Sequence, residues 1–179
     1  SQPTLSFDPS AKTAMDKQEP PAPGADFRVV IVGAGNINFG SDEGPWNHSF
    51  RLEHKLGPRL KVVALIDPDA ERARRVLKTK CQSFVLSAYK DTVVYPTFKD
   101  YMASVCAETY PHAVWVGSPP AFRGGTEPGR NLEQLLTAGL PNVPLFIEKP
   151  VSTGAVDQTF EVAKMLEQNG SLCLLYTSD

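Results

Sequence analysis

The chain has 179 residues, of which 41% are hydrophobic and 21% charged, and this length fits one domain of about 150 residues whose core needs no disulfide bonds. Its 18 Lys and Arg against 20 Asp and Glu give a formal net charge of −2, which argues against non-specific nucleic-acid binding because such binding needs an excess of cations. No apolar run approaches the ~20 residues of a membrane-spanning helix, the N-terminus has no apolar signal region, and three widely spaced cysteines are typical of reduced thiols, so we expect a cytoplasmic protein that binds neither membranes nor nucleic acid.

The first 25 residues hold five of the sixteen prolines but only two large aliphatic or aromatic side chains, Leu5 and Phe7. Such a stretch cannot bury enough surface to offset the entropy lost on ordering, so we expect residues 1–25 to be a disordered tail. A docking motif or an arm that covers a cofactor is the functional alternative.

Short apolar runs rich in β-branched residues follow, as expected of strands buried on both faces. They cover residues 27–32, 60–66, 92–95, 113–116 and 144–147, and residues 171–176 could add a sixth. Apolar residues at helical spacing lie between them, in residues 50–56, 70–77, 98–105, 132–136 and 156–166. Strands that alternate with helices form right-handed crossovers and a parallel sheet covered on both faces. The sequence therefore predicts a doubly wound α/β fold over residues 26–172.

A glycine-rich turn, Gly33-Ala34-Gly35-Asn36-Ile37-Asn38, follows the first strand. Ligands of open α/β sheets bind beyond the carboxyl ends of the strands. The first glycine permits the tight turn, and the second lets backbone N–H groups approach a pyrophosphate. The loop of residues 41–46 then delays the next helix, for which Asn47 or Ser49 is the expected N-cap.

The second strand ends in Asp67. An acidic residue at this place accepts hydrogen bonds from the adenosine ribose and repels a 2′-phosphate; its structural alternative is the N-cap of a helix that begins near Pro68. Glycine turn and carboxylate together predict a dinucleotide site that favours NAD. NADP stays possible because Arg72, Arg74 and Arg75 lie close in the sequence.

The fourth strand ends in Val116-Gly117-Ser118-Pro119-Pro120 and the fifth in Glu148-Lys149-Pro150. Together with the glycine turn and the acidic end of the second strand, these motifs resemble the Gfo/Idh/MocA oxidoreductases over roughly residues 27–171. The resemblance implies a Rossmann-type NAD(P)-binding fold. It also implies that Gly33 and Gly35, with the amides of Asn36 and Ile37, cradle the pyrophosphate, and that Asp67 holds the adenosine ribose.

For the other end of the cofactor, the resemblance implies that Ser118 and Pro119 line the path toward the nicotinamide. Glu148 and Lys149 would lie at the nicotinamide ribose and the reacting carbon. Pro150 belongs to a turn that aims the lysine, often through a cis peptide bond. Lys149 is the candidate catalytic residue, because a lysine can polarise the substrate hydroxyl or relay its proton while the cofactor carries the hydride.

Both residues also have a purely structural interpretation: Lys149 could be a surface lysine beside a strand end, and Glu148 could pair with a neighbouring Lys or Arg. Two departures from the family pattern leave roles open. Arg123 stands where the family has a histidine, and Asn38 occupies the third glycine position. The three histidines have no metal-ligand spacing, so we expect no metal site.

In the family that the chain resembles, a second α/β domain supplies the substrate pocket, and the sequence shows none of it. We therefore expect the NAD(P)-binding half of a dehydrogenase acting on the CH–OH group of a sugar or polyol. Alone it should be inactive and monomeric, whereas a full-length parent should be a homo-oligomer. Residues 173–179 resemble a translated sequencing adapter and are expected to be a non-native tail, unless they form a short edge strand.

Two other classes of function stay open at this point. One is a non-catalytic regulator that senses a dinucleotide through the same fold. The other is a structural α/β domain whose crevice holds no ligand. The Glu148-Lys149 pair favours the enzyme, since a sensor does not need these side chains.

Overall fold

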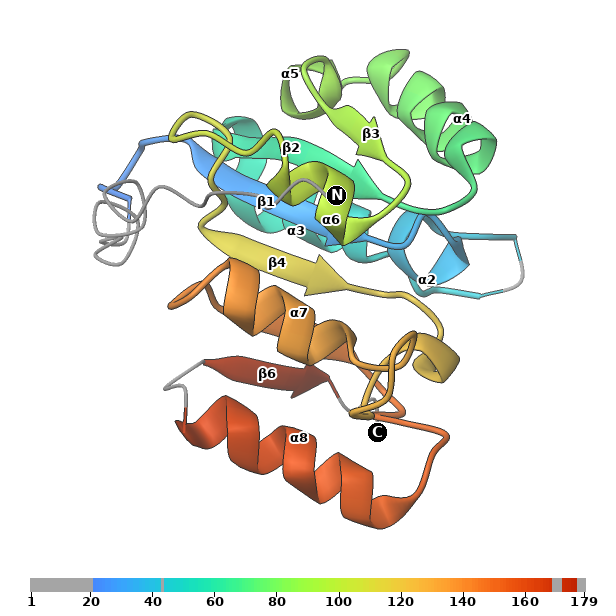
Figure 1. The fold of residues 1–179 in the computed structure, drawn as a ribbon. Coiled ribbons are helices and arrows are strands. Elements are labelled where there is room, and N and C mark those ends of the chain that lie inside the picture. The colour runs from blue at the N-terminus through green and yellow to red at the C-terminus, as the bar shows by residue number, and fades with distance from the viewer. Residues whose placement is uncertain (1–20, 43, 169–171, 177–179) are drawn as a thin grey trace, which may run out of the picture.

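The computed structural model describes residues 21–42, 44–168 and 172–176. The strands within these ranges are β1 (Phe27–Val32), β2 (Leu60–Ile66), β3 (Val93–Tyr95), β4 (Ala113–Val116), β5 (Leu145–Glu148) and β6 (Cys173–Tyr176). They form one parallel sheet in the order β3-β2-β1-β4-β5-β6 (Figure 1). This is the predicted doubly wound α/β fold, and it is confirmed.

Helices cover the sheet on both sides (Figure 1). They are α2 (Asn36–Phe39), α3 (His48–Leu56), α4 (Ala70–Cys81), α5 (Leu86–Tyr89), α6 (Phe98–Met102), α7 (Leu132–Gly139) and α8 (Val156–Gln168), with the short 3-10 helices η1 (Gly57–Arg59) and η2 (Pro120–Phe122). Neither α2 nor α5 was predicted from the sequence, because a single helical turn leaves no periodic pattern. The helix expected over residues 98–105 ends at Met102.

The central strand contributes to a separate core on each face of the sheet, because successive side chains of a strand point to opposite faces. Val30 and Val32 pack in the core that also contains side chains of α6, α7 and α8. Val29 and Ile31 pack in the core that contains side chains of α3, α4 and α5. Burial on both faces is the reason why residues 29–32 of β1 are a continuous apolar run in the sequence.

The N-caps of α3 and α4 test the caps that were predicted from the sequence. Asn47 is the N-cap of α3, as predicted, and its Oδ1 accepts from the N–H of Phe50 at 2.9 Å. The cap of α4 is Asp69, whose Oδ1 accepts from the N–H of Arg72 at 2.9 Å. The alternative role of Asp67 as this cap is therefore wrong, since Asp67 still belongs to the turn that follows β2.

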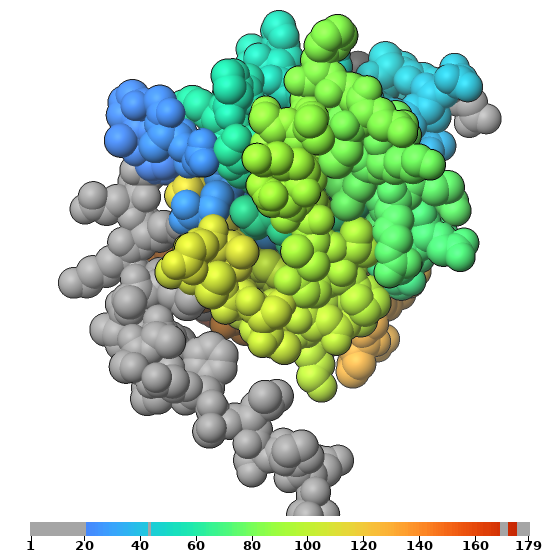
Figure 2. Space-filling view, turned by 90° about the horizontal axis from the view of Figure 1, so that it is seen from above, coloured from blue at the N-terminus to red at the C-terminus, as the bar shows by residue number. Residues whose placement is uncertain are grey.

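The ends of the chain are described only in part. Residues 1–20 of the expected disordered tail and residues 177–179 of the expected non-native tail lie outside the described residues. Residues 22–25 form a turn in which the N–H of Ala25 donates to the carbonyl of Ala22 at 3.0 Å. Arg28 Nε donates to the carbonyl of Tyr110 at 2.7 Å, so the start of β1 lies beside the loop before β4, the blue and yellow segments of Figure 2. Residues 173–176 form β6, which pairs with β5.

The described part of the chain contains no helix that is long and apolar enough to cross a membrane. Its cysteines, Cys81, Cys106 and Cys173, are all free thiols.

Candidate functional site

A cavity of about 450 Å³ opens at the carboxyl ends of the strands. It lies where the strand order reverses, since the chain runs from β1 to β2 and β3 on one side and returns to β4 on the other. Ligands of doubly wound sheets bind at this switch point. The lining includes every residue that the sequence analysis assigned to a cofactor: Gly33, Gly35, Asn36, Ile37, Asp67, Ser118, Pro119, Glu148 and Lys149. Arg72, Gly117, Pro120 and Arg123 complete it.

The glycine turn passes close to the turn that follows β4. Gly33 has a φ of 97°, and a Cβ at this position would lie 3.0 Å from the backbone nitrogen of Ser118. A Cβ on Gly35, in contrast, would meet nothing within 4 Å, so open space begins at this residue. Asn36 and Ile37 are the first residues of α2, where backbone N–H groups have no acceptor within their own helix. The turn thus offers donors and room for an anionic group.

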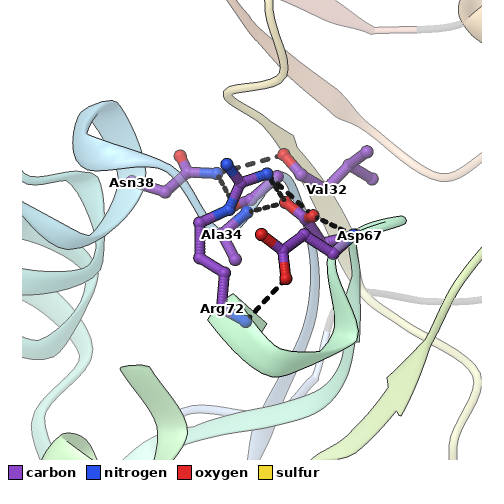
Figure 3. A network of polar contacts seen from close by, with 7 residues as sticks. Val32, Ala34, Asn38, Asp67 and Arg72 are labelled. Atoms are coloured by element: carbon purple, nitrogen blue, oxygen red, sulfur yellow. Dashed lines mark hydrogen bonds and ion pairs between the residues drawn. The ribbon is translucent and has the colours of Figure 1, made fainter. Parts of the chain in front are cut away.

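Asn38, in place of the third glycine, ties this turn together (Figure 3). Its Nδ2 donates to the carbonyls of Val32 at 3.0 Å and Gly33 at 2.7 Å, and the residue is buried. A Cβ on Gly117 would overlap the Asn38 carboxamide. The larger residue therefore fits at position 38 because position 117 has no side chain.

Asp67 is buried and holds a network of donors around its carboxylate (Figure 3). Oδ2 accepts from the N–H of Ala34 at 2.6 Å, and Oδ1 accepts from the N–H of Asp69 at 2.8 Å. Arg72 Nη2 lies 2.8 Å and 3.0 Å from the two oxygens. The bond to Ala34 joins the end of β2 directly to the glycine turn, so the Asp67 carboxylate is fixed beside this turn.

Glu148 lies at the end of β5 and is paired with His48, the first residue of α3. The two side chains are buried, and His48 Nε2 lies 2.6 Å from Glu148 Oε1. Burial lowers the pKa of His48, while the hydrogen bond to the Glu148 carboxylate acts in the opposite direction. The expected alternative, a pair between Glu148 and a Lys or Arg, is wrong.

The pairing of His48 with Glu148 could not be predicted from the sequence, because 100 residues separate the two. Only the packing of α3 against the sheet brings the two together. The available signal was its place directly after the Asn47 cap, in the first helix after the glycine turn.

Lys149 is exposed and borders the cavity. The peptide bond between Lys149 and Pro150 is cis, as the resemblance implied. Arg123, whose role was open, is almost completely buried and donates to backbone carbonyls. Its Nε donates to Ser118 at 3.0 Å and its Nη1 to Pro150 at 2.7 Å and Val151 at 3.1 Å.

The size of the cavity suits a small-molecule ligand. Its volume lies within the usual range for such sites, ~300–1,000 Å³, and the space over Gly35 is open. Metal-ligating side chains do not gather in threes anywhere in the part of the chain that the structure describes.

Comparisons with known proteins agree with this geometry. The Gfo/Idh/MocA family, described as "Oxidoreductase family, NAD-binding Rossmann fold", matches residues 27–177. Two curated proteins of Schizosaccharomyces pombe are similar: Uncharacterized protein C12C2.04 is 43% identical over 147 residues, which are 81% of this chain and 38% of that protein. Uncharacterized protein UNK4.17 is 39% identical over 162 residues, 89% of this chain and 40% of that protein. The chain thus spans about two fifths of the length of these relatives.

Among solved structures, the transcriptional regulator Gal80p from Kluyveromyces lactis has a similar fold. The likeness has a TM-score of 0.54 at 15% identity and covers 96% of this chain and 34% of that one. At this level of identity the two chains share the fold alone.

Proposed function

We propose that this chain, which belongs to the Gfo/Idh/MocA oxidoreductase family, is the cofactor-binding part of an enzyme that transfers a hydride between NAD and a CH–OH group of a sugar, polyol or related compound. One observation carries the proposal. The glycine turn, the Asp67 carboxylate and the Glu148-Lys149 pair line a single cavity at the switch point of the sheet.

In this proposal the cofactor lies along that cavity. The N–H groups of Asn36 and Ile37 bind the pyrophosphate above Gly35, and Asp67 accepts from the adenosine ribose. Ser118 and Pro119 border the path to the nicotinamide, whose ribose contacts Glu148. Each of these residues lines the cavity, which supports the assignment.

Lys149 is the proposed catalytic residue. A bound nicotinamide supplies the acceptor or donor of the hydride. In the direction of oxidation the uncharged Lys149 amine would accept the hydroxyl proton as the carbinol becomes a carbonyl, and in the direction of reduction the Lys149 ammonium would return that proton to the carbonyl oxygen. The exposure of Lys149 at the edge of the cavity supports this role, because a substrate can approach it from solvent.

NAD is the proposed cofactor rather than NADP, because the buried Asp67 carboxylate would repel a 2′-phosphate. Arg72 could receive such a phosphate, but its guanidinium already binds Asp67. NADP is therefore expected to bind more weakly. The curated relatives are longer than this chain, and we propose that substrate-binding groups and subunit contacts lie in regions that correspond to their additional length. The chain alone is then expected to bind the cofactor without turnover.

Thermal unfolding of the 179-residue chain with NAD, NADH and NADPH tests the proposal. A ligand at a hundredfold excess over its dissociation constant stabilises the chain by ~2.7 kcal/mol, and we expect such a shift with NAD and NADH. Gly35→Ala serves as the matched variant: the free chain loses about 1 kcal/mol at most, whereas the dinucleotide shift falls sharply because the methyl enters the pyrophosphate space. A chain that no dinucleotide stabilises would contradict the proposal.

A further inference from the structure

We infer that His48 is a positioning residue for the nicotinamide end of the cavity: through the Glu148 carboxylate it fixes the backbone of Lys149. The inference rests on the proposed function and adds to it a residue of α3 that lies outside the cavity lining. It starts from the pairing of a buried imidazole with a cavity carboxylate.

Each oxygen of the Glu148 carboxylate has its own hydrogen-bond partner. Oε1 lies 2.6 Å from His48 Nε2, and Oε2 accepts from the N–H of Lys149 at 2.8 Å. A carboxylate held at both oxygens has little freedom to rotate, so the imidazole determines which way it faces. The residue that carries the proposed catalytic amine is therefore tied to His48 through one side chain.

His48 is itself held from two directions. Its ring lies 5.5 Å from that of Trp115 and 5.2 Å from that of Phe146, which stack on each other at 3.7 Å. The preceding residue, Asn47, caps α3 and donates from Nδ2 to the carbonyl of Phe39 at the end of α2. Because α2 follows the glycine turn, this chain of contacts connects the two ends of the proposed dinucleotide site.

The charge state of His48 agrees with the positioning role. Burial lowers the pKa of His48 from its usual value of 6.5, so the imidazole is neutral at neutral pH. A neutral imidazole with its hydrogen on Nε2 donates to the carboxylate without neutralising it. The other carboxylate oxygen, Oε2, accepts from the N–H of Lys149.

The test compares His48→Leu, which removes the donor, with His48→Gln, whose side-chain amide can donate from nearly the same place. His54→Leu is the matched control, since His54 is an exposed residue of the same helix. For each 179-residue chain, affinities for NADH and for ADP-ribose are measured, because ADP-ribose lacks the nicotinamide. The position of the Lys149 amide signal in a ¹H–¹⁵N correlation spectrum gives a second readout that needs no ligand.

We expect His48→Leu to move the Lys149 amide signal and to weaken NADH about tenfold, the effect of one lost hydrogen bond to a charged group, with ADP-ribose affinity unchanged. His48→Gln should restore both, and His54→Leu should change neither. An unmoved Lys149 signal overturns the inference, and so does an equal loss of NADH and ADP-ribose affinity in His48→Leu. An unaltered wild-type chain that binds neither ligand overturns the proposed function itself.

Discussion

Arg123 Nη1 donates to the carbonyl oxygen of Pro150 at 2.7 Å. Arg123 follows η2 on the turn after β4, and Pro150 follows β5, so the bond joins the two turns that border the nicotinamide end of the proposed site. Arg123 occupies the position where related oxidoreductases are expected to carry a histidine. Its guanidinium is buried and donates hydrogen bonds to backbone carbonyls. Arg123 therefore links the turn after β4 to the turn after β5 at the edge of the cavity.

Arg123→Leu should lower the free energy of unfolding by about 3 kcal/mol or more, since three carbonyls lose a charged donor. Urea unfolding near neutral pH measures this. Arg75→Leu is the control: Arg75 is exposed and forms a single loose ion pair with Glu71 at 3.8 Å, so a change within ~0.5 kcal/mol is expected. Equal stability losses in the two variants would show that Arg123 does not support the turns.

Asp67→Asn should change the cofactor preference. The substitution removes the charge that repels a 2′-phosphate and releases Arg72 from its ion pair, so the ratio of NADPH to NADH affinity should rise at least several-fold. Adding Arg72→Gln in the same chain should reverse the gain for NADPH without a further loss for NADH. Titration of both cofactors by fluorescence gives the ratio, and an equal loss of affinity for both would contradict the ribose assignment.

Gly117→Ala should destabilise the chain by about 1–3 kcal/mol, as expected for overpacking. The new methyl group overlaps the Asn38 carboxamide, which must leave the carbonyls of Val32 and Gly33. In an Asn38→Gly background the same change should cost much less, because the space is then free. The double-mutant cycle in urea measures this coupling, and additive effects would mean that the two positions do not compete for one space.

His112 gives the chain a dependence of stability on pH. Burial lowers the pKa of His112 from 6.5, and its Nδ1 accepts from the N–H of Arg28 at 2.8 Å, which only the unprotonated nitrogen can do. The unfolded chain then binds more protons than the folded chain, so the free energy of unfolding rises with pH. The contribution of His112 is complete above about pH 6.5 and is lost as the pH falls below this value.

His112→Asn should keep the acceptor for Arg28 and reduce the slope of unfolding free energy against pH between about pH 5 and pH 7. The remaining slope belongs in part to His48, whose pKa is lowered in the same direction. Urea unfolding at several pH values measures the slope. If His112→Asn leaves it unchanged, protonation of His112 is not coupled to folding.

Much of the architecture follows from local sequence. β1, β2 and β4 have the predicted bounds because strands buried on both faces consist mainly of apolar residues, many of them β-branched. The cavity lining was also predictable, since the carboxyl ends of parallel strands meet at one edge of a sheet. Asp67 and Glu148 could therefore be placed together from sequence alone, although they belong to different strands.

Contacts between distant side chains could not be predicted. His48 contacts Glu148 because of the angle at which α3 packs on the sheet, and Arg123 contacts Pro150 because of the path of the turn after β4. No spacing in the sequence encodes that angle. The same reason explains why Asn38 appeared only as a broken motif, although its amide fits the space that Gly117 leaves.

The indole of Trp115 stacks on Phe146 and lies beside the His48 ring. Because the sequence has two tryptophans and Trp46 is 40% exposed, Trp46→Phe leaves a chain with one tryptophan, next to the imidazole that faces Glu148. Its emission overlaps the absorption of a reduced nicotinamide, so NADH bound at the proposed site would quench it by energy transfer. The fluorescence of Trp115 therefore provides a direct readout of whether the proposed nicotinamide end of the cavity is occupied.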